Sequence, residues 1–211
     1  MKRLRTITIV IALACLAASV SAERKGLSKP SQRTFEVSPK KVYLGPKFTV
    51  GMVVGDVSTL ISDLGGSTSD KIFYGFGFDG SYTLSPKVLV GGTVEYQWKT
   101  VMGDRDADDP IILTSFSAHG IYKLSGKSRS TFYLRPEVGS ISAKLPYDRG
   151  DAGPSTFVRL GVGQWHATGP TTLARLELYY KHAFSKDEAL FGFADYDVQG
   201  VGIDIAFAFG L

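Results

Sequence analysis

The chain has 211 residues, a length that suits a single domain with a sizeable interior. Its 24 basic residues exceed its 20 acidic residues, but three of the basic residues and no acidic residue lie in the first 22 positions, so the remaining balance of 21 to 20 gives no support to nucleic-acid binding. The one cysteine, Cys15, lies in the same segment, so residues 23–211 contain no disulfide and must be held together by hydrogen bonds and burial.

The first 22 residues have the pattern of a secretory signal peptide. They begin with three basic residues, Lys2, Arg3 and Arg5. Residues 7–18 are apolar but too short to span a bilayer, and residues 20–22 (Val-Ser-Ala) supply small side chains at the cleavage positions, so we expect cleavage after Ala22. Lipidation of Cys15 is the alternative, and it is disfavoured because Ala12 stands three residues upstream, where lipoproteins usually have leucine. No later stretch of about 20 apolar residues exists, which excludes a helical membrane span.

Residues 23–46 are predicted to form an irregular, basic lead-in. They contain six basic residues against two acidic ones, together with Pro30, Pro39 and Pro46. The short apolar pieces at 35–37 and 42–44 suit at most a small strand pair or a cover for the mouth of the domain that follows, because proline disfavours long pairing.

From residue 47 onward, apolar side chains alternate with small or polar ones in eight stretches, which predicts eight strands. In the second stretch, for example, Tyr74 and Phe76 alternate with Gly75 and Gly77, so the two kinds of side chain point to opposite faces. The predicted strands cover residues 47–57, 72–84, 87–99, 111–124, 131–143, 156–166, 172–184 and 199–211.

The lengths of the links between these strands also alternate. The links after the first, third, fifth and seventh strands are long, at about 58–71, 100–110, 144–155 and 185–198. The other links are short, as is typical of the periplasmic turns of outer-membrane barrels. The sequence therefore predicts an all-β fold: a transmembrane, antiparallel, up-and-down barrel of eight strands over residues 47–211, in the outer membrane of a Gram-negative bacterium. Both termini and the lead-in then lie in the periplasm.

The last strand predicts which face meets the lipid. One face carries only large apolar side chains, from Val201, Ile203, Ile205, Phe207, Phe209 and Leu211. The other carries Gly202, Asp204, Ala206, Ala208 and Gly210. Small residues suit the crowded interior of an eight-stranded barrel, so the apolar face is expected to point outward. Aromatic residues near the strand ends then form two interfacial girdles: Tyr74, Tyr96, Trp98 and Phe184 on one side, and Tyr82, Tyr122, Phe132 and Phe207 on the other. A secreted soluble barrel that carries an apolar ligand is the alternative.

Residues 47–211 resemble the small eight-stranded outer-membrane barrel family, which includes OmpX-like and opacity-type surface proteins. The resemblance rests on the architecture and on the closing strand, where Phe207 and Phe209 match the alternating aromatic positions. It implies contact with outer-membrane lipid and lipopolysaccharide, and recognition of the C-terminal strand by the barrel assembly machinery. The chain departs from the family's usual terminal aromatic residue by ending in Leu211.

The interior face is predicted to hold a paired network of ionisable residues that plugs the barrel. The expected members are Asp79, Glu95, Lys99, Lys123, Arg135, Glu137, Arg159, Arg175, Glu177, Lys181 and Asp204. Neighbouring strands are expected to bring Arg135 and Glu137 to Arg159, and Arg175 and Glu177 to Asp204. A narrow ion path is the alternative. We also expect a β-bulge, or a late start of regular pairing, at Pro136, because proline lacks a donor for the ladder.

No catalytic, cofactor or metal site is predicted. His119 is expected to be a satisfied interior residue, His166 lies near a periplasmic turn, and His182 lies on the lipid face near Ser185 and Asp187. The chain is expected to be a non-enzymatic, porin-like monomer of the cell envelope that acts through its exposed loops, in surface contact or in envelope integrity. A lipid-A-modifying hydrolase is the enzymatic alternative. The loop acids Asp104, Asp106, Asp108 and Asp109 are candidates for bridging cations to lipopolysaccharide, although they lack the spacing of a calcium loop. No nucleic-acid partner is expected, and no surface ligand can be named.

Overall fold

The computed structural model describes residues 41–55, 58, 71–99, 111–124, 130–144, 151–168, 171–184 and 198–211. The expected signal peptide, most of the lead-in, and the acidic loop residues 104–109 lie outside the described residues. Among the described residues, no helix has the length and apolar character needed to cross a membrane.

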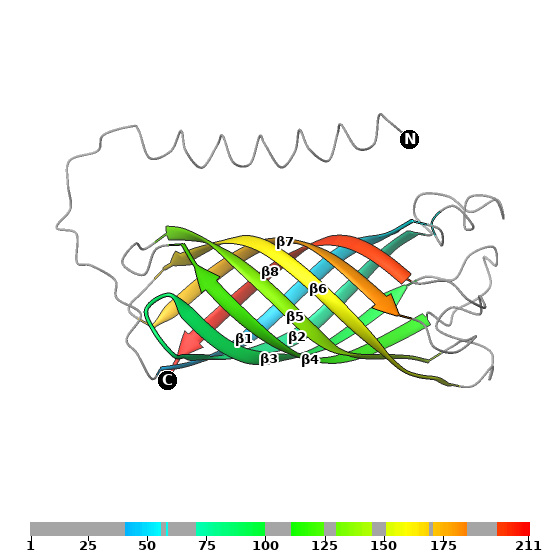
Figure 1. Ribbon diagram of the computed structural model, residues 1–211, viewed down its shortest axis with the longest axis horizontal. Coiled ribbons are helices and arrows are strands. Elements are labelled where there is room, and N and C mark those ends of the chain that lie inside the picture. Colours follow the sequence, from blue (N-terminus) through cyan, green and yellow to red (C-terminus); the bar gives the residue numbers. More distant parts are fainter. Residues whose placement is uncertain are drawn as a thin grey trace, which may run out of the picture. The chain divides into compact units, whose positions relative to one another are not determined.

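Eight strands form a closed antiparallel barrel, as the alternation predicts (Figure 1). They are β1 (Val42–Val54), β2 (Ile72–Thr83), β3 (Val88–Lys99), β4 (Ile111–Lys123), β5 (Ser130–Lys144), β6 (Asp151–Ala167), β7 (Thr172–Phe184) and β8 (Val198–Gly210). Each strand pairs with the next one along the chain, and β8 pairs with β1. Closure leaves no unpaired sheet edge, which is the condition for a sheet to exist within a bilayer.

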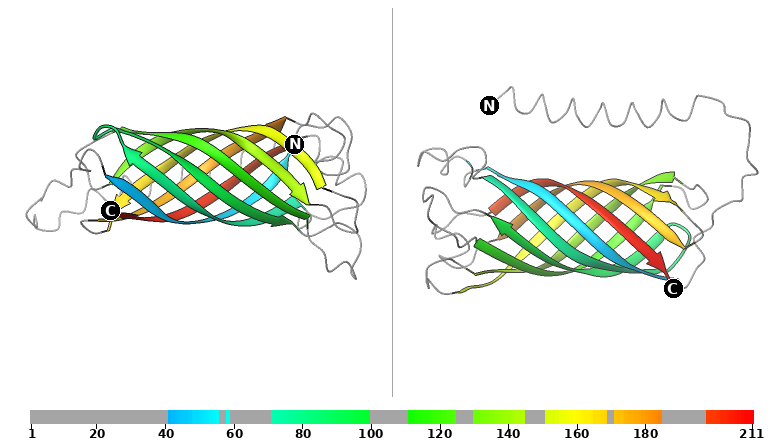
Figure 2. Two further views of the ribbon diagram at one scale, coloured as in Figure 1. Left: turned by 90° about the horizontal axis from the view of Figure 1, so that it is seen from below. Right: turned by 180° about the vertical axis from the view of Figure 1, so that it is seen from behind.

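The register of the strand pairs determines how steeply the strands slope. Paired outward positions run once around the barrel from Leu44 through Gly80, Gly92, Ala118, Val138, Val158, His182 and Gln199 to Val54. The path returns to β1 ten residues beyond its start. A stagger of this size over eight strands corresponds to a tilt of roughly 40°, within the range of membrane barrels. Figures 1 and 2 show the sloping strands from three sides.

The first strand begins at Val42, five residues before the predicted start at 47, and it includes Pro46. Pro46 pairs with Phe78 of β2, but the paired positions between β1 and β8 pass from Leu44 to Lys47. The missing donor of the proline therefore interrupts only one of its two ladders, and the strand continues through it.

The bulge expected at Pro136 is absent, so that expectation is wrong. Pro136 pairs with Leu160 in an unbroken register with β6, and toward β4 the pairing skips Arg135 and Pro136 without changing register. The register shift lies between Ile141 and Ala143 instead. Strands β5 and β6 also extend beyond their predicted ends, so the link between them spans 145–150 and is shorter than the expected 144–155.

Large apolar side chains cover the outer wall, and glycines, alanines and polar residues lie on the inward face, which confirms the predicted faces. Phe78, Phe116 and Leu160 are 59%, 58% and 54% exposed, whereas Ala206 is 3% exposed. Inward glycines make room for larger partners: a Cβ on Gly161 would lie 2.4 Å from the Glu177 carboxylate. The barrel thus presents an apolar surface outward and reserves its interior for polar and selected aromatic groups.

Candidate functional site

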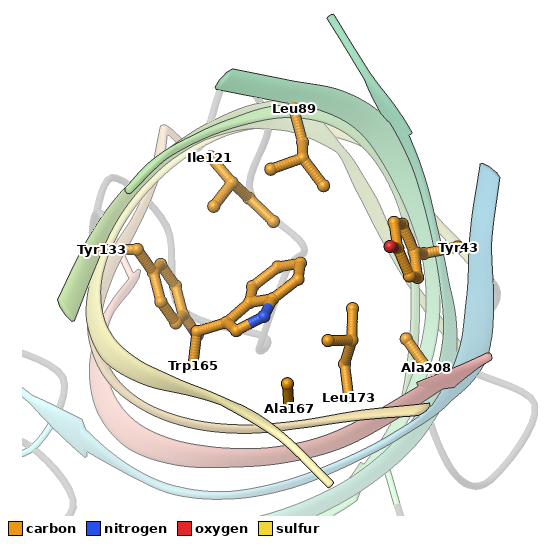
Figure 3. Close-up of a cluster of buried hydrophobic side chains, with 8 residues drawn as sticks. All are labelled: Tyr43, Leu89, Ile121, Tyr133, Trp165, Ala167, Leu173 and Ala208. Atoms are coloured by element: carbon orange, nitrogen blue, oxygen red, sulfur yellow. The ribbon is translucent and has the colours of Figure 1, made fainter. Parts of the chain in front are cut away.

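Apolar side chains close the interior at one end of the barrel. This end carries the short links 84–87, 124–129 and 168–171 and is called the turn end; the opposite end is called the loop end. This turn-end cluster consists of Tyr43, Leu89, Ile121, Tyr133, Trp165, Ala167, Leu173 and Ala208. Figure 3 shows these side chains pointing inward from the surrounding strands, with Trp165 reaching toward the middle. The Trp165 ring meets Tyr43 and Tyr133 edge-on, at centroid distances of 6.1 and 6.4 Å. The sequence prediction named only ionisable and small residues for the interior and missed these large aromatic side chains, which share the inward face with glycines and alanines.

A second apolar layer lies at the loop end of the barrel. Its buried members are Val53, Phe73, Leu113, Ile141, Ala143, Phe157 and Ala183. Phe73 lies across β1, because a Cβ on Gly51 would come within 2.2 Å of its ring. Apolar side chains therefore narrow the interior on both sides of its middle.

The middle of the barrel holds the predicted ionic network. Its described charged side chains are Lys47, Asp79, Glu95, Arg135, Glu137, Arg159, Arg175, Glu177, Lys181 and Asp204, each at most 5% exposed. Five cations face five anions, so this layer is electrically balanced, as deep burial requires. The sequence prediction omitted Lys47, because it placed the start of the first strand at that residue. The side chain of Lys99 lies outside the described part, and Lys123 lies in the turn-end layer, 5.2 Å from the centre of the Trp165 ring.

Arg159 of β6 lies at the centre of this network. Its guanidinium donates to Glu177 at 2.7 Å and is in close contact with Asp204. Glu177 and Asp204 stand directly opposite each other on β7 and β8, so their carboxylates repel unless a cation lies between them. The guanidinium also stacks 3.7 Å from the centre of the Tyr179 ring. Its Nε lies 3.8 Å from Glu137, which confirms the expected grouping of Glu137 with Arg159.

Arg135 of β5 is a second centre of the network, and one of its partners, Asp79, also binds Arg175. Its guanidinium lies 2.8 Å from Asp79, 3.3 Å from Glu137 and 3.6 Å from Glu177. Arg175 also turns to Asp79, at 2.9 Å, and not to Asp204 as expected from adjacent strands. In a narrow barrel, a long side chain reaches strands on the far wall as readily as its neighbours.

Contacts across the lumen leave no open path through the middle layer. Lys47 Nζ lies 3.0 Å from Glu95 and 3.3 Å from Asp204, and Thr49 Oγ1 lies 2.5 Å from Glu95. One residual space in this layer, lined by Lys47, Tyr133, Arg135, Arg175, Glu177, Asp204 and Ala206, is too narrow to hold a water molecule. The described side chains therefore obstruct the interior at this level.

Comparison with known proteins gives matches among solved structures. No protein-family model matches the chain, and no curated protein matches it. Neisserial surface protein A matches with a TM-score of 0.57 at 13% identity, over 80% of this chain and 96% of that one. Ail, the attachment invasion locus protein of Yersinia pestis, matches with a TM-score of 0.53 at 14% identity, over 82% of this chain and 100% of that one. A structure of Ail with the heparin analogue sucrose octasulfate matches with a TM-score of 0.51 at 15% identity.

The chain has the fold of the small eight-stranded outer-membrane barrels. The same strand number, closure and antiparallel order are present in the described residues. The identity to these structures is too low to carry over any residue role, so the chemistry of this barrel has to be judged from its own side chains.

His119 lies inside the barrel beside a serine and an aspartate, but the three do not form a catalytic relay. Its Nε2 lies 3.0 Å from Ser81 Oγ and 3.6 Å from Asp79. Arg135 donates to Nδ1 at 3.1 Å, which leaves the ring proton on Nε2. A relay needs the base to receive the serine proton on one nitrogen and be held by the acid through the other. Here both contacts share one nitrogen, so His119 is the satisfied interior residue that the sequence predicts.

The other two histidines lie on the outer wall. His182 is half-buried, with Nδ1 3.3 Å from the Tyr180 hydroxyl and its ring 4.5 Å from that of Phe184. The neighbouring Ser185 and Asp187 lie outside the described residues. His166 is exposed near the turn end, opposite Ser130.

Proposed function

We propose that the protein is a monomeric, integral barrel of the bacterial outer membrane that catalyses no reaction, conducts no ions and acts through its long loops, in surface contact or in envelope integrity. The single observation that carries this proposal is the filled interior. A balanced ionic layer lies between two apolar layers, so the loops are the part of the molecule left to meet partners.

Three observations disfavour the three alternative functions. An ion path needs a continuous water column, and the described space between Lys47, Arg135 and Asp204 is too narrow to hold water. A soluble carrier of an apolar ligand needs an apolar cavity and a polar exterior, whereas Phe48 and Val50 of this chain are each 50% exposed on the outer wall. A lipid-modifying hydrolase needs a nucleophile, a base and an orienting acid that converge, and the described serine, histidine and aspartate that do meet, Ser81, His119 and Asp79, share one ring nitrogen.

The proposed orientation places both termini in the periplasm and the long loops outside the cell. Three of the four links at that end support it, because the links at 55–71, 100–110 and 185–197 are long, whereas the link at 145–150 is no longer than the one at 124–129. Outer-membrane barrels have short periplasmic turns and longer external loops. The partners that follow are the outer-membrane lipid and lipopolysaccharide around the wall, and the barrel assembly machinery, which would recognise β8 through Phe207 and Phe209. We propose no nucleic-acid partner.

We do not extend the polysulfated ligand of Ail to this chain. The loop at 100–110 carries Asp104, Asp106, Asp108 and Asp109 beside the single cation Arg105. Clustered carboxylates repel a polysulfated sugar at ordinary ionic strength.

The proposal is tested by cell fractionation together with planar-bilayer recording. We expect the full chain, expressed in a Gram-negative host, to remain in the detergent-extracted outer-membrane fraction and to change its gel mobility on boiling. Protease added to intact cells should cut the long links and not the short turns. The purified barrel should give no steady ion current in a planar bilayer. A soluble species without a mobility shift, protection of the long links in intact cells, or a reproducible single-channel current would each overturn part of the proposal.

A further inference from the structure

Among the described residues, the aromatic side chains at the loop end of the outer wall do not form a complete ring. Strands β2, β3 and β7 carry Tyr74, Trp98 and Phe184 there, which are 48%, 40% and 41% exposed. Strands β4, β5 and β6 carry hydroxyl residues in their place, namely Thr114, Ser140, Ser142 and Thr156. These four residues are called the hydroxyl patch below.

The hydroxyl patch is continuous across three strands. Thr114 pairs with Ser142, and Ser140 pairs with Thr156, so the four side chains form two neighbouring cross-strand pairs on the same face. Lys144 follows on this face of β5, two residues after Ser142. It is exposed, and its paired position on β6 is Asp151. The patch therefore spans about 10 Å across the strands, with a cation at its loop side.

Most hydroxyls of the patch lack a partner. Within the described chain, the side chains of Thr114, Ser140 and Thr156 make no hydrogen bond, although Ser142 Oγ lies 3.5 Å from the carbonyl oxygen of Thr114. Hydroxyls that face lipid tails without a partner are unfavourable, whereas partners are available among lipid head groups.

The depth of the patch matches that of head groups. Trp98 pairs with Ile112 of β4, and Thr114 is the next residue on that face. Since a tilted strand rises about 2.5 Å per residue along the barrel axis, and each step to the next strand adds about 3 Å, the patch lies within roughly 5 Å of the depth of Trp98. Exposed tryptophan marks the membrane interface in barrels.

We propose that the hydroxyl patch and Lys144 bind the phosphorylated sugar head group of a glycolipid in the leaflet next to the long loops. Several hydroxyls spread over three strands match a sugar that presents many donors and acceptors, and the ammonium of Lys144 matches a phosphate. This inference rests on the proposed function, which places that leaflet at the cell surface.

A second copy of the chain fits this surface less well. A two-fold contact between identical patches would bring two Lys144 side chains together, and like charges in a membrane interface repel. A simple phospholipid offers only one phosphate and no sugar ring, so most of the patch would stay unpaired. The glycolipid is therefore the occupant whose chemistry accounts for both the hydroxyls and the cation.

The test measures binding of purified diphosphoryl lipid A to the folded barrel in phosphatidylcholine nanodiscs, by titration and native mass spectrometry. The patch variant combines Thr114→Val, Ser140→Ala, Ser142→Ala and Thr156→Val, and a separate variant carries Lys144→Ala. The matched control combines Thr168→Val, Thr172→Val and Lys87→Ala, which remove two hydroxyls and one lysine at the turn end. All of these positions are on the outer wall or in a turn, and the mobility shift on boiling shows whether each variant folds.

We expect the patch variant to bind lipid A about tenfold or more weakly, and the control to bind within about twofold of the unmodified chain. Lys144→Ala should weaken the binding of diphosphoryl lipid A but leave the binding of dephosphorylated lipid A unchanged. Phosphatidylglycerol should not compete with lipid A for the barrel. Equal binding by the patch variant and the control would overturn the inference, as would equal binding of phosphatidylglycerol, or a dimer that the patch variant abolishes. Binding in nanodiscs does not depend on how the barrel is oriented in the cell. A loss of the expected lipid A binding would therefore reject this inference without rejecting the orientation that the protease experiment tests.

Discussion

Replacing Arg159 with glutamine should destabilise the barrel strongly, because this guanidinium holds two opposed carboxylates together. Arg159 donates to Glu177 at 2.7 Å and touches Asp204, and these two acids are directly paired across β7 and β8. In the Arg159→Gln variant, the nearest remaining cations to this pair are Arg135, 3.6 Å from Glu177, and Lys47, 3.3 Å from Asp204. Both of those cations are already shared with other carboxylates.

The magnitude follows from the burial of the ion pair. Arg159 is 3% exposed, Glu177 and Asp204 are each 2% exposed, and so little solvent screens the charge that the substitution leaves behind. Breaking a buried ion pair by removing one partner costs about 3–5 kcal/mol. Removing Asp204 as well should recover part of this cost, since the double variant no longer leaves two carboxylates facing each other. We expect a coupling energy of about 0.5–3 kcal/mol.

The assay is equilibrium urea unfolding of the barrel refolded into lipid vesicles, with the mobility shift on boiling as a second signal. Arg159→Gln, Asp204→Asn and the double variant form the cycle. Lys181→Met is the matched control inside the same layer, because Lys181 Nζ has no hydrogen-bond partner in the described part and lies 4.2 Å from the centre of the Phe157 ring. This control removes one charge from the balanced layer without breaking a hydrogen bond, so it should lower the free energy of unfolding clearly less than Arg159→Gln does. Strict additivity in the cycle, or a cost for Arg159→Gln no larger than that of Lys181→Met, would refute the reasoning.

Three further substitutions test the wall and the turn-end cluster. Leu178→Arg places a cation on the outer wall, where Leu178 is 40% exposed, and should cost about 2–4 kcal/mol in the same urea assay, whereas a normal free energy of unfolding would invert the assigned faces. Gly45→Ala should cost about 1–3 kcal/mol and speed hydrogen exchange between β1 and β8, because its Cβ would overlap the carbonyl of Phe207. The control Gly120→Ala, which brings no other atom within 4 Å of the new methyl, should change stability by less than about 0.5 kcal/mol. Equal effects of the two substitutions would contradict the close approach at Gly45. Trp165→Ala should cost about 3–5 kcal/mol, since the ring is 2% exposed and fills the space between Tyr43 and Tyr133, and a loss below about 1 kcal/mol would mean that the turn end is not closed by packing.

Much of the fold was readable from the sequence because the two sides of the barrel wall constrain each strand separately. Every outward position belongs to the apolar outer wall and every inward position to a narrow interior, so the two-residue alternation repeats in all eight strands regardless of which strands pair. For the same reason the sequence placed His119 and Asp204 inside and Leu178 outside.

The strand boundaries at proline were not readable in this way. Pro46 looks like a terminator when one strand is considered alone, and Pro136 looks like the site of a bulge. In the closed barrel each proline loses a donor toward only one neighbour, and the other ladder keeps the register. This is why Lys47, one residue after Pro46, was missed as a member of the ionic layer.

Alternation along a strand determined which side chains enter the barrel, but not what they meet there. The partner of Arg175 on β7 is Asp79 on β2, and Lys47 on β1 reaches past β2 to Glu95 on β3. These pairings depend on the stagger of ten residues and on a barrel narrow enough for long side chains to cross, and both are properties of the closed sheet. The sequence by itself therefore determined the strand count and the two faces, whereas the closed sheet decided the ion pairs, the apolar layers and the hydroxyl patch, because only closure sets which residues from distant strands share a depth.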